Sequence, residues 1–242
     1  MIRVGFFATC LVDAMRPEIG LSAVMLLEQA GCTVEVPPRQ TCCGQPAYNS
    51  GDSRTARALA EQVLRDFEHF DYVVLPSGSC GASIKGDYPD LFRDDPDLRA
   101  RFEALAARTY ELTDFLVSVC RIDRLQSRFA GRITYHDSCS GLRYLGVREQ
   151  PRKLLALLPA VELTEMDDAQ QCCGFGGTFA VKYGEISGAI VGDKCRNIQA
   201  SGADAVVLGD LGCMLNIEGR LRRSGDERTR VLHIAQVLAG DA

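Results

Sequence analysis

The sequence predicts an α/β protein made of two pseudo-symmetric lobes, each a mostly parallel sheet flanked by helices. Short apolar runs typical of strands alternate with longer segments of helical periodicity, which predicts parallel strands joined by helical crossovers. A set of four cysteines also occurs twice in the same order, and the segments around these cysteines recur. We therefore expect one lobe at residues 1–125 and a second at residues 126–242.

The elements follow in order along the chain. In the first half, residues 3–8, 33–36 and 72–75 are apolar or β-branched runs that predict strands, while residues 17–30 and 52–70 predict helices. Pro17 suits the start of the first helix and Gly31 its end. In the second half, strands are expected at 132–135, 161–163 and 205–208, and helices at 150–158 and 183–200. Residues 122–131 are expected to connect the halves.

The repeated motif is a single cysteine, a Cys-Cys-Gly sequence and a last cysteine. The single cysteine and the pair are separated by 31 residues in the first half and 32 in the second, and 36 and 39 residues lead on to the last cysteine. The flanks match as well, since DYVVLPSGSC ending at Cys80 corresponds to DAVVLGDLGC ending at Cys213. The eight motif cysteines are Cys10, Cys42, Cys43, Cys80, Cys139, Cys172, Cys173 and Cys213.

These cysteines follow the carboxyl ends of predicted strands, directly or within a short loop. Ligands of open α/β sheets bind at that edge, so four distant cysteines can converge on one point in each lobe. Four thiolates suit either zinc or an iron–sulfur cluster. Adjacent cysteines cannot both bind one ion comfortably, which favours a group with several metal atoms. Zinc and thiol–disulfide chemistry remain the alternatives.

Other residues near the motifs have predicted supporting roles. Gly44 and Gly174 are expected to allow a sharp backbone turn and to offer N–H donors beside the site. His136 and Asp137 precede Cys139 and are interpreted as an outer-sphere donor or a proton relay, although a histidine satisfied within its loop fits the sequence equally well. The cysteines outside the repeat are expected to lie in the core: Cys32, Cys120 and Cys195.

Composition excludes several classes of function. The net charge of −5 and the pI near 5.3 argue against a nucleic-acid-binding face. No apolar stretch approaches the roughly 18 residues of a membrane span. Eleven cysteines in a chain expected to be cytoplasmic indicate metal ligands or redox groups more than disulfides.

The segments YHDSC, QCCGFGGTFAVKY and LPSGSCG resemble the CCG family, named for its Cys-Cys-Gly motif. That family includes the catalytic subunit of heterodisulfide reductase and the iron–sulfur subunit of glycolate oxidase, and the resemblance is strongest to its lactate-utilisation members. It implies a cluster of the [4Fe–4S] type on each motif. It also implies a non-autonomous redox subunit of a cytoplasmic complex that oxidises L-lactate or a related 2-hydroxy acid to pyruvate. The implied partners are a ferredoxin-like iron–sulfur subunit and a third small subunit.

One departure from that family concerns the end of each motif. The fullest family motif ends in Cys-x-x-Cys and supplies five thiolates to a non-cubane cluster, whereas this chain has Ser83 and Asn216 at the final positions. The loss argues against the non-cubane cluster and disulfide cleavage. A thiol–disulfide redox subunit like that of heterodisulfide reductase and a zinc-stabilised, non-enzymatic scaffold are the alternative functions, and the sequence leaves open whether the chain is itself an enzyme.

Overall fold

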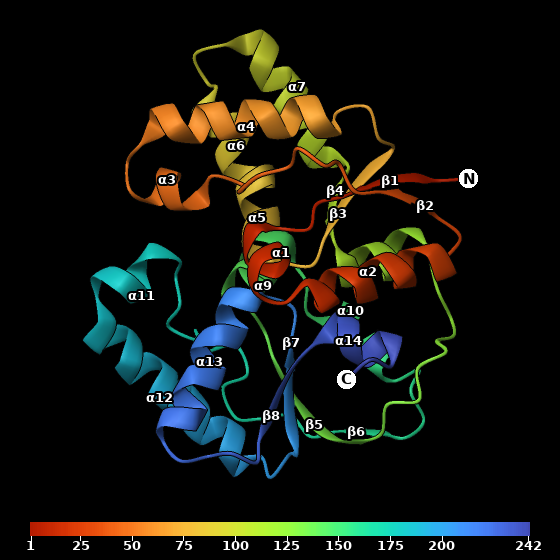
Figure 1. Ribbon diagram of the computed structural model, residues 1–242, viewed down its shortest axis with the longest axis vertical. Coiled ribbons are helices and arrows are strands. Elements are labelled where there is room, and N and C mark those ends of the chain that lie inside the picture. Colours follow the sequence, from red (N-terminus) through yellow and green to blue (C-terminus); the bar gives the residue numbers. More distant parts are fainter.

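The strands form two separate four-stranded sheets in the computed structural model, which describes residues 1–242 (Figure 1). Every hydrogen-bonded pair of strands is parallel, which confirms the predicted α/β class. The strand order is β2-β1-β3-β4 in one sheet and β6-β5-β7-β8 in the other. The strands are β1 Arg3–Phe6, β2 Thr33–Glu35, β3 Tyr72–Leu75, β4 Thr109–Glu111, β5 Gly131–His136, β6 Val161–Leu163, β7 Ala205–Leu208 and β8 Arg230–His233.

Helices of the first lobe cover its sheet and carry two of its cysteines. Pro17 opens α2, where its fixed φ suits a helix start. The Asp52 side chain accepts a hydrogen bond from the Thr55 N–H and caps α4. The helices are α1 Cys10–Met15, α2 Pro17–Gln29, α3 Gln45–Asn49, α4 Ser53–Phe67, α5 Gly78–Ala82, the π-helix η1 Ser83–Asp87, α6 Tyr88–Leu91, α7 Pro96–Ala107, α8 Leu112–Asp114 and the π-helix η2 Phe115–Val119.

The second lobe repeats this plan with fewer helices. Its last helix begins with a capping box, in which His233 accepts from the backbone and Gln236 returns a side-chain contact to His233. The helices are α9 Cys139–Leu145, α10 Glu149–Leu155, α11 Thr178–Lys182, α12 Gly184–Ala200, α13 Leu211–Arg223 and α14 Ile234–Ala239. None of the helices in either lobe is long and apolar enough to cross a membrane.

The predicted strands and helices are all present, with ends that differ by a few residues. The sequence prediction missed the helices α7 and α13, and it missed β4 and β8, which are short outer strands beginning with Thr109 and Arg230. Residues 121–130 contain neither helix nor strand, as expected of a connector. The position of the domain boundary at residue 125 stays a prediction.

The lobes share a hydrophobic core. Helix α2 packs against α14, and buried Ile19 and Leu27 of the first lobe belong to the same apolar cluster as Val237 and Leu238 of the second. A second cluster lies within the first lobe and contains the fully buried Phe67. Because one cluster is continuous across the lobes, their relative position is held by apolar burial as well as by polar contacts.

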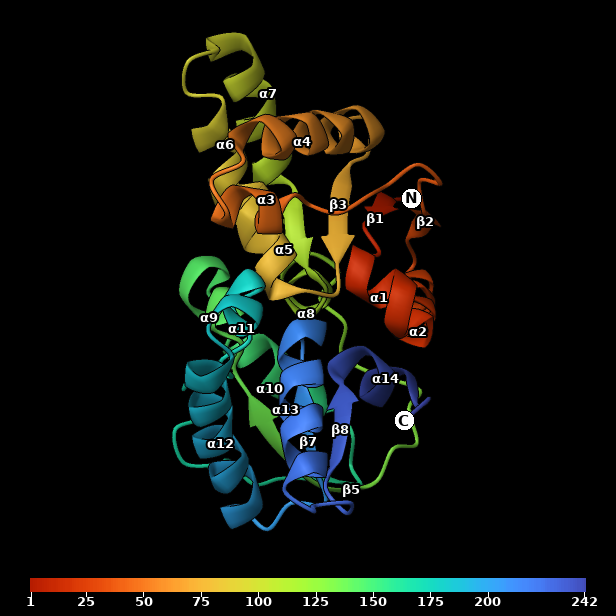
Figure 2. The same cartoon turned by 60° about the vertical axis from the view of Figure 1, so that its left-hand side comes forward.

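The strands of the two sheets point toward each other, so that their carboxyl ends meet at the boundary between the lobes (Figure 2). Helix α5 packs against α9 at that boundary. A Cβ atom at Gly78 would lie 2.8 Å from both the Cα and the backbone N of Gly141. The two helices can therefore approach this closely only because Gly78 has no side chain.

Hydrogen bonds also cross the boundary. One carboxylate oxygen of Asp210, the residue that caps α13, accepts from the Ser77 hydroxyl at 3.0 Å and from the Ser79 N–H at 2.9 Å. The other accepts from the Gly212 N–H at 3.1 Å. Nδ1 of buried His233 accepts from the Ala235 N–H, which leaves Nε2 to donate to the Pro76 carbonyl at 3.1 Å.

We predict that Gly78→Ala weakens the contact between the lobes. The added methyl group meets backbone rather than a mobile side chain, so the overpacking should lower the free energy of unfolding by about 1–3 kcal/mol. The control is Gly188→Ala within α12, where a Cβ meets nothing within 4 Å. Urea unfolding of both variants checks the prediction, and equal midpoints would contradict it.

Candidate metal centres

The four motif cysteines of the first lobe converge at the carboxyl edge of its sheet. Cys10 is the first residue of α1, Cys42 and Cys43 lie in the loop before α3, and Cys80 lies in α5. The Cys43 and Cys80 Sγ atoms are 3.4 Å apart, and the neighbouring Cys10 and Cys42 thiols shift each other's pKa, raising that of Cys10 and lowering that of Cys42. Thr9, just before Cys10, has a φ of 66°, a strained value for a β-branched residue.

The second lobe repeats this arrangement. Cys139 is the first residue of α9, Cys172 and Cys173 lie in the loop before α11, and Cys213 lies in α13. The Cys173 and Cys213 Sγ atoms are 2.9 Å apart, and the neighbouring Cys139 and Cys172 thiols shift each other's pKa, raising that of Cys139 and lowering that of Cys172. The structure therefore brings together all eight cysteines that the sequence indicated, as two groups of four.

Within each pair the two cysteines face different partners. Cys42 meets Cys10 while Cys43 meets Cys80, and the second lobe repeats this pattern. The neighbouring thiols of Cys10 and Cys43 lower the pKa of Cys42, and those of Cys139 and Cys173 lower the pKa of Cys172. In each site one thiol is favoured as the thiolate, and the two adjacent cysteines face different partners. This arrangement fits a group with several metal atoms better than a single ion.

The glycine after each pair turns the backbone toward the site. Gly44 and Gly174 have φ values of 83° and 80°, in the region that favours glycine. Their N–H groups donate to the Sγ of Cys42 at 3.4 Å and of Cys172 at 3.3 Å. A Cβ on Gly174 would also lie 2.8 Å from the Ser187 carbonyl oxygen. The predicted backbone donors are thus located at a thiol of each site.

In each lobe a side chain hydrogen-bonds to the backbone carbonyl of the second cysteine of the Cys-Cys pair. The buried Tyr88 hydroxyl donates to the Cys43 carbonyl at 2.7 Å, and the Asn216 amide donates to the Cys173 carbonyl at 2.8 Å. Asn216 stands where the fullest family motif has its fifth cysteine. At the matching position of the first lobe, the Ser83 hydroxyl donates to Asp87 at 2.8 Å.

His136 ends β5 and is fully buried, and neither of its ring nitrogens has a hydrogen-bond partner. Its ligand atom lies within 4.8 Å of those of Cys173 and Cys213. Burial, followed by the charge of Lys194, lowers the pKa of His136 to about 3, so the ring is neutral. The Ala169 carbonyl favours the charged ring slightly but makes no well-formed hydrogen bond with it.

The Asp137 side chain is engaged by an arginine. Its buried carboxylate forms a two-point ion pair with Arg152, at 2.8 and 3.0 Å, and Arg152 also pairs with Glu165. The proton-relay role predicted for Asp137 therefore has no support from its contacts. Its interpretation as an outer-sphere residue stays a prediction.

Lys194 is a residue that the sequence interpretation missed. Its side chain is fully buried and Nζ donates to the carbonyls of Asp168 at 2.6 Å and Ala169 at 3.3 Å. These carbonyls lie just before the Cys172–Cys173 pair, so Lys194 braces that loop. The signal was available, since the spacing of Lys194 from the apolar Val191 and Ile198 puts all three on the buried face of α12.

The three cysteines outside the repeat lie away from both sites. Cys32 and Cys195 are buried, as expected of core residues, and Cys120 is half-buried against the core. The Cys32 and Cys120 Sγ atoms are 3.9 Å apart, while the Cys195 thiol faces the Ile217 carbonyl.

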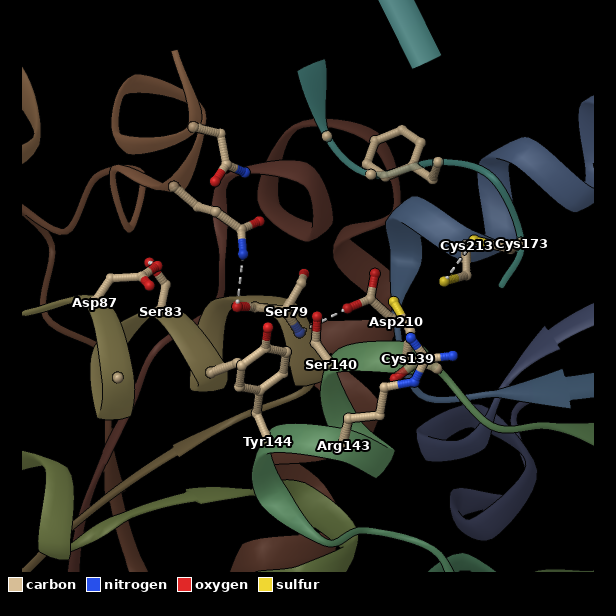
Figure 3. Close-up of a pocket in the computed structure, with 18 residues that line it drawn as sticks. Ser79, Ser83, Asp87, Cys139, Ser140, Arg143, Tyr144, Cys173, Asp210 and Cys213 are labelled. Atoms are coloured by element: carbon tan, nitrogen blue, oxygen red, sulfur yellow. Dashed lines mark hydrogen bonds between the residues drawn. The ribbon is translucent and has the colours of Figure 1, made fainter. Parts of the chain in front are cut away.

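Each cysteine site opens on a cavity that the other lobe helps to close. A cavity of about 270 Å³ over the first-lobe cysteines is also lined by Phe175, Thr178 and Leu211 of the second lobe. A cavity of about 410 Å³ beside Cys139, Cys173 and Cys213 is also lined by first-lobe residues, and Figure 3 shows Ser83 and Asp87 at its far end. The cavities share wall residues: Gln45, Ser79, Phe175, Gly177 and Asp210.

Arg143 is the one cationic side chain lining the larger cavity. It extends from α9 beside Tyr144 (Figure 3), and it forms neither an ion pair nor a hydrogen bond within the chain. The two acids of the wall are engaged, because Asp210 binds the start of α5 and Asp87 binds Ser83. A guanidinium without a partner beside a thiol cluster can bind a small anion.

Comparison with known proteins agrees with two similar cysteine sites, one in each lobe. The family model described as "CCG: Cysteine-rich domain" matches residues 4–85 and 133–218, one copy in each lobe. Lactate utilization protein A of Geobacillus kaustophilus (strain HTA426) is 48% identical over 237 residues, which is 98% of either chain. Lactate utilization protein A 2 of Bacillus cereus (strain Q1) is 44% identical over 238 residues, again 98% of either chain.

Among solved structures, a hypothetical protein from Helicobacter pylori has the same fold, with a TM-score of 0.65 at 12% identity. The match covers 99% of this chain, which spans about half, 49%, of that protein's chain. The two matched segments, the eight converging cysteines and the full-length relatives lead to one conclusion: the chain belongs to the CCG family of cysteine-rich domain proteins and carries two copies of the domain.

Proposed function

We propose that this chain is an iron–sulfur redox subunit of a cytoplasmic complex that oxidises L-lactate, or a related 2-hydroxy acid, to pyruvate. The observation that carries the proposal is the pair of four-cysteine sites, which face each other across adjoining cavities at the lobe boundary. The relatives' name, lactate utilization protein A, supports the substrate. The proposed partners are a ferredoxin-like iron–sulfur subunit and a third small subunit.

The proposed cofactors are clusters of the [4Fe–4S] type. Cys10, Cys42, Cys43 and Cys80 would hold one, and Cys139, Cys172, Cys173 and Cys213 the other. When bound, each cluster supplies one-electron redox chemistry, and two centres match the two electrons that a 2-hydroxy acid loses. The N–H groups of Gly44 and Gly174 stabilise negative charge on the sulfur atoms of their sites.

The larger cavity is the proposed position of the substrate. The Arg143 guanidinium supplies a two-point partner for a carboxylate, and the Ser140 and Tyr144 hydroxyls line the same wall. Residues of both lobes line this space, and a carboxylate bound to Arg143 would lie in the same cavity as Cys139. The role of the chain's own residues is therefore to bind and orient the carboxylate at the second-lobe centre.

A thiol–disulfide redox subunit is the second candidate. The 2.9 Å separation of the Cys173 and Cys213 Sγ atoms favours it, because two thiols this close can form a disulfide with little movement. Asn216 argues against it, because the side chain at the position of the fifth family cysteine holds the Cys173 carbonyl. We therefore rank it below the iron–sulfur subunit.

Metal analysis of protein purified without oxygen tests the proposal. The expected product is brown, absorbs broadly near 400 nm, and contains about four iron and four sulfide per motif with an EPR signal on reduction. Colourless protein with stoichiometric zinc would instead support a zinc-stabilised scaffold. Iron-free protein whose thiols cycle with a disulfide substrate would support the second candidate.

We predict that Cys172→Ser removes about half of the iron. Cys172 is the thiolate-favoured member of the second site and has no contact with the first, so only one cluster should be lost. The matched control is Cys195→Ala, which removes a buried cysteine outside the repeat. Iron content per chain checks the prediction, and wild-type iron in the Cys172 variant would contradict the ligand assignment.

We predict that Arg143→Gln weakens substrate binding in the assembled complex. Loss of a charge-assisted contact costs about 1.5–3 kcal/mol, so the KM for L-lactate should rise about 10- to 100-fold with iron content unchanged. Arg54→Gln on the exposed face of α4 is the control. An unchanged KM in the Arg143 variant would place the substrate elsewhere.

A further inference from the structure

His136 is a buried imidazole whose hydrogen-bonding capacity is wholly unused. Both ring nitrogens lack a partner, and no other buried titratable side chain has every polar atom in this state. Leaving such a group unsatisfied costs about 1–3 kcal/mol. The chain's other buried histidine shows the usual solution, because His233 uses Nδ1 for the Ala235 N–H and Nε2 for the Pro76 carbonyl. No group of the chain forms a well-formed hydrogen bond with the His136 ring, although the Ala169 carbonyl lies near it, so the ring is free to bind another partner.

The position of the ring indicates what that partner is. A ligand nitrogen of His136 and the Sγ atoms of Cys173 and Cys213 all lie within 4.8 Å of one another, and all three residues are buried. Imidazole nitrogen and thiolate sulfur together are a common donor set for zinc and for iron in proteins. The nearest buried amine, Lys194, is already bound to two carbonyls and cannot satisfy the ring.

The first lobe shows that the fold itself does not require a histidine here. His136 lies three residues before Cys139, and Phe7 lies three residues before Cys10. Phe7 is fully buried and packs in the apolar cluster that contains Cys43 and Phe67. An apolar ring thus fills at one site the position that the His136 imidazole occupies at the other, although the four thiols of the two sites correspond.

We infer that His136 is a direct metal ligand of the second-lobe centre, so that this centre has mixed cysteine and histidine ligation while the first has cysteine alone. The inference rests on the proposed function, because it requires an iron-containing group in the site. In this ligation the imidazole takes the place of one of the four thiolates proposed above, and a neutral ligand in place of a thiolate raises the reduction potential of an iron–sulfur centre. The second-lobe centre, which adjoins the larger cavity, therefore has the higher potential of the two.

The test is nitrogen hyperfine spectroscopy on the reduced, anaerobically purified full chain, labelled with ¹⁵N-histidine. We expect one strongly coupled histidine nitrogen in the wild type and in the control His69→Gln, which alters a histidine outside both sites. His136→Phe, which copies the first lobe, should lose that coupling and lower the potential of one centre only. Wild-type protein with iron but without a strongly coupled nitrogen would overturn the inference, whether or not the variant folds.

The outcomes separate the two proposals. Iron without nitrogen coupling leaves the iron–sulfur function standing and removes His136 as a ligand. Protein without iron overturns the proposed function and the histidine assignment together. Coupling that survives in His136→Phe assigns the nitrogen to another histidine and also overturns the inference.

Discussion

The carboxylate of Asp210 connects the two cysteine sites. It is almost completely buried, and such a charge is tolerated only when hydrogen bonds replace its water. Asp210 accepts three, two from the start of α5 in the first lobe and one from the start of α13 in the second. Cys80 and Cys213 lie on these helices. One side chain therefore sets the relative position of a thiol from each site, and the cavities beside both depend on it.

The two lobes repeat the same backbone arrangement and the same four thiols, which we call the frame, but the residues around the thiols differ. The frame consists of parallel strands whose carboxyl ends meet, four thiols and a glycine with positive φ. It also includes a side chain that donates to the carbonyl of the second paired cysteine, which is Tyr88 in the first lobe and Asn216 in the second. The surroundings differ, because Phe7 of the first lobe corresponds to His136 of the second, and the buried Lys194 binds the loop before the cysteine pair of the second site. The reduction potential of a metal centre and the access of a substrate to it depend on the surrounding residues as well as on the thiols. Two copies of one motif can therefore differ in chemistry.

Local patterns predicted much of the fold. The apolar runs at 72–75, 161–163 and 205–208 are strands as expected, and the cysteine repeat correctly indicated convergence in each lobe. The strands β4 and β8 were missed because three or four residues with polar ends show little periodicity. Contacts between distant residues were also out of reach. Neither the ion pair of Asp137 with Arg152 nor the closure of each cavity by the opposite lobe leaves a mark in local sequence.

Asn216 gives a structural role to the position at which the fullest family motif has a fifth cysteine. Its amide donates to the Cys173 carbonyl and approaches the Ser187 hydroxyl, so the position now supports the backbone of a cysteine rather than contributing one. A cysteine at this position would add a thiol but leave that buried carbonyl without its donor, at a cost of about 1–3 kcal/mol. A fifth thiolate and a firmly held Cys173 backbone therefore compete for the same position, and this chain has the second.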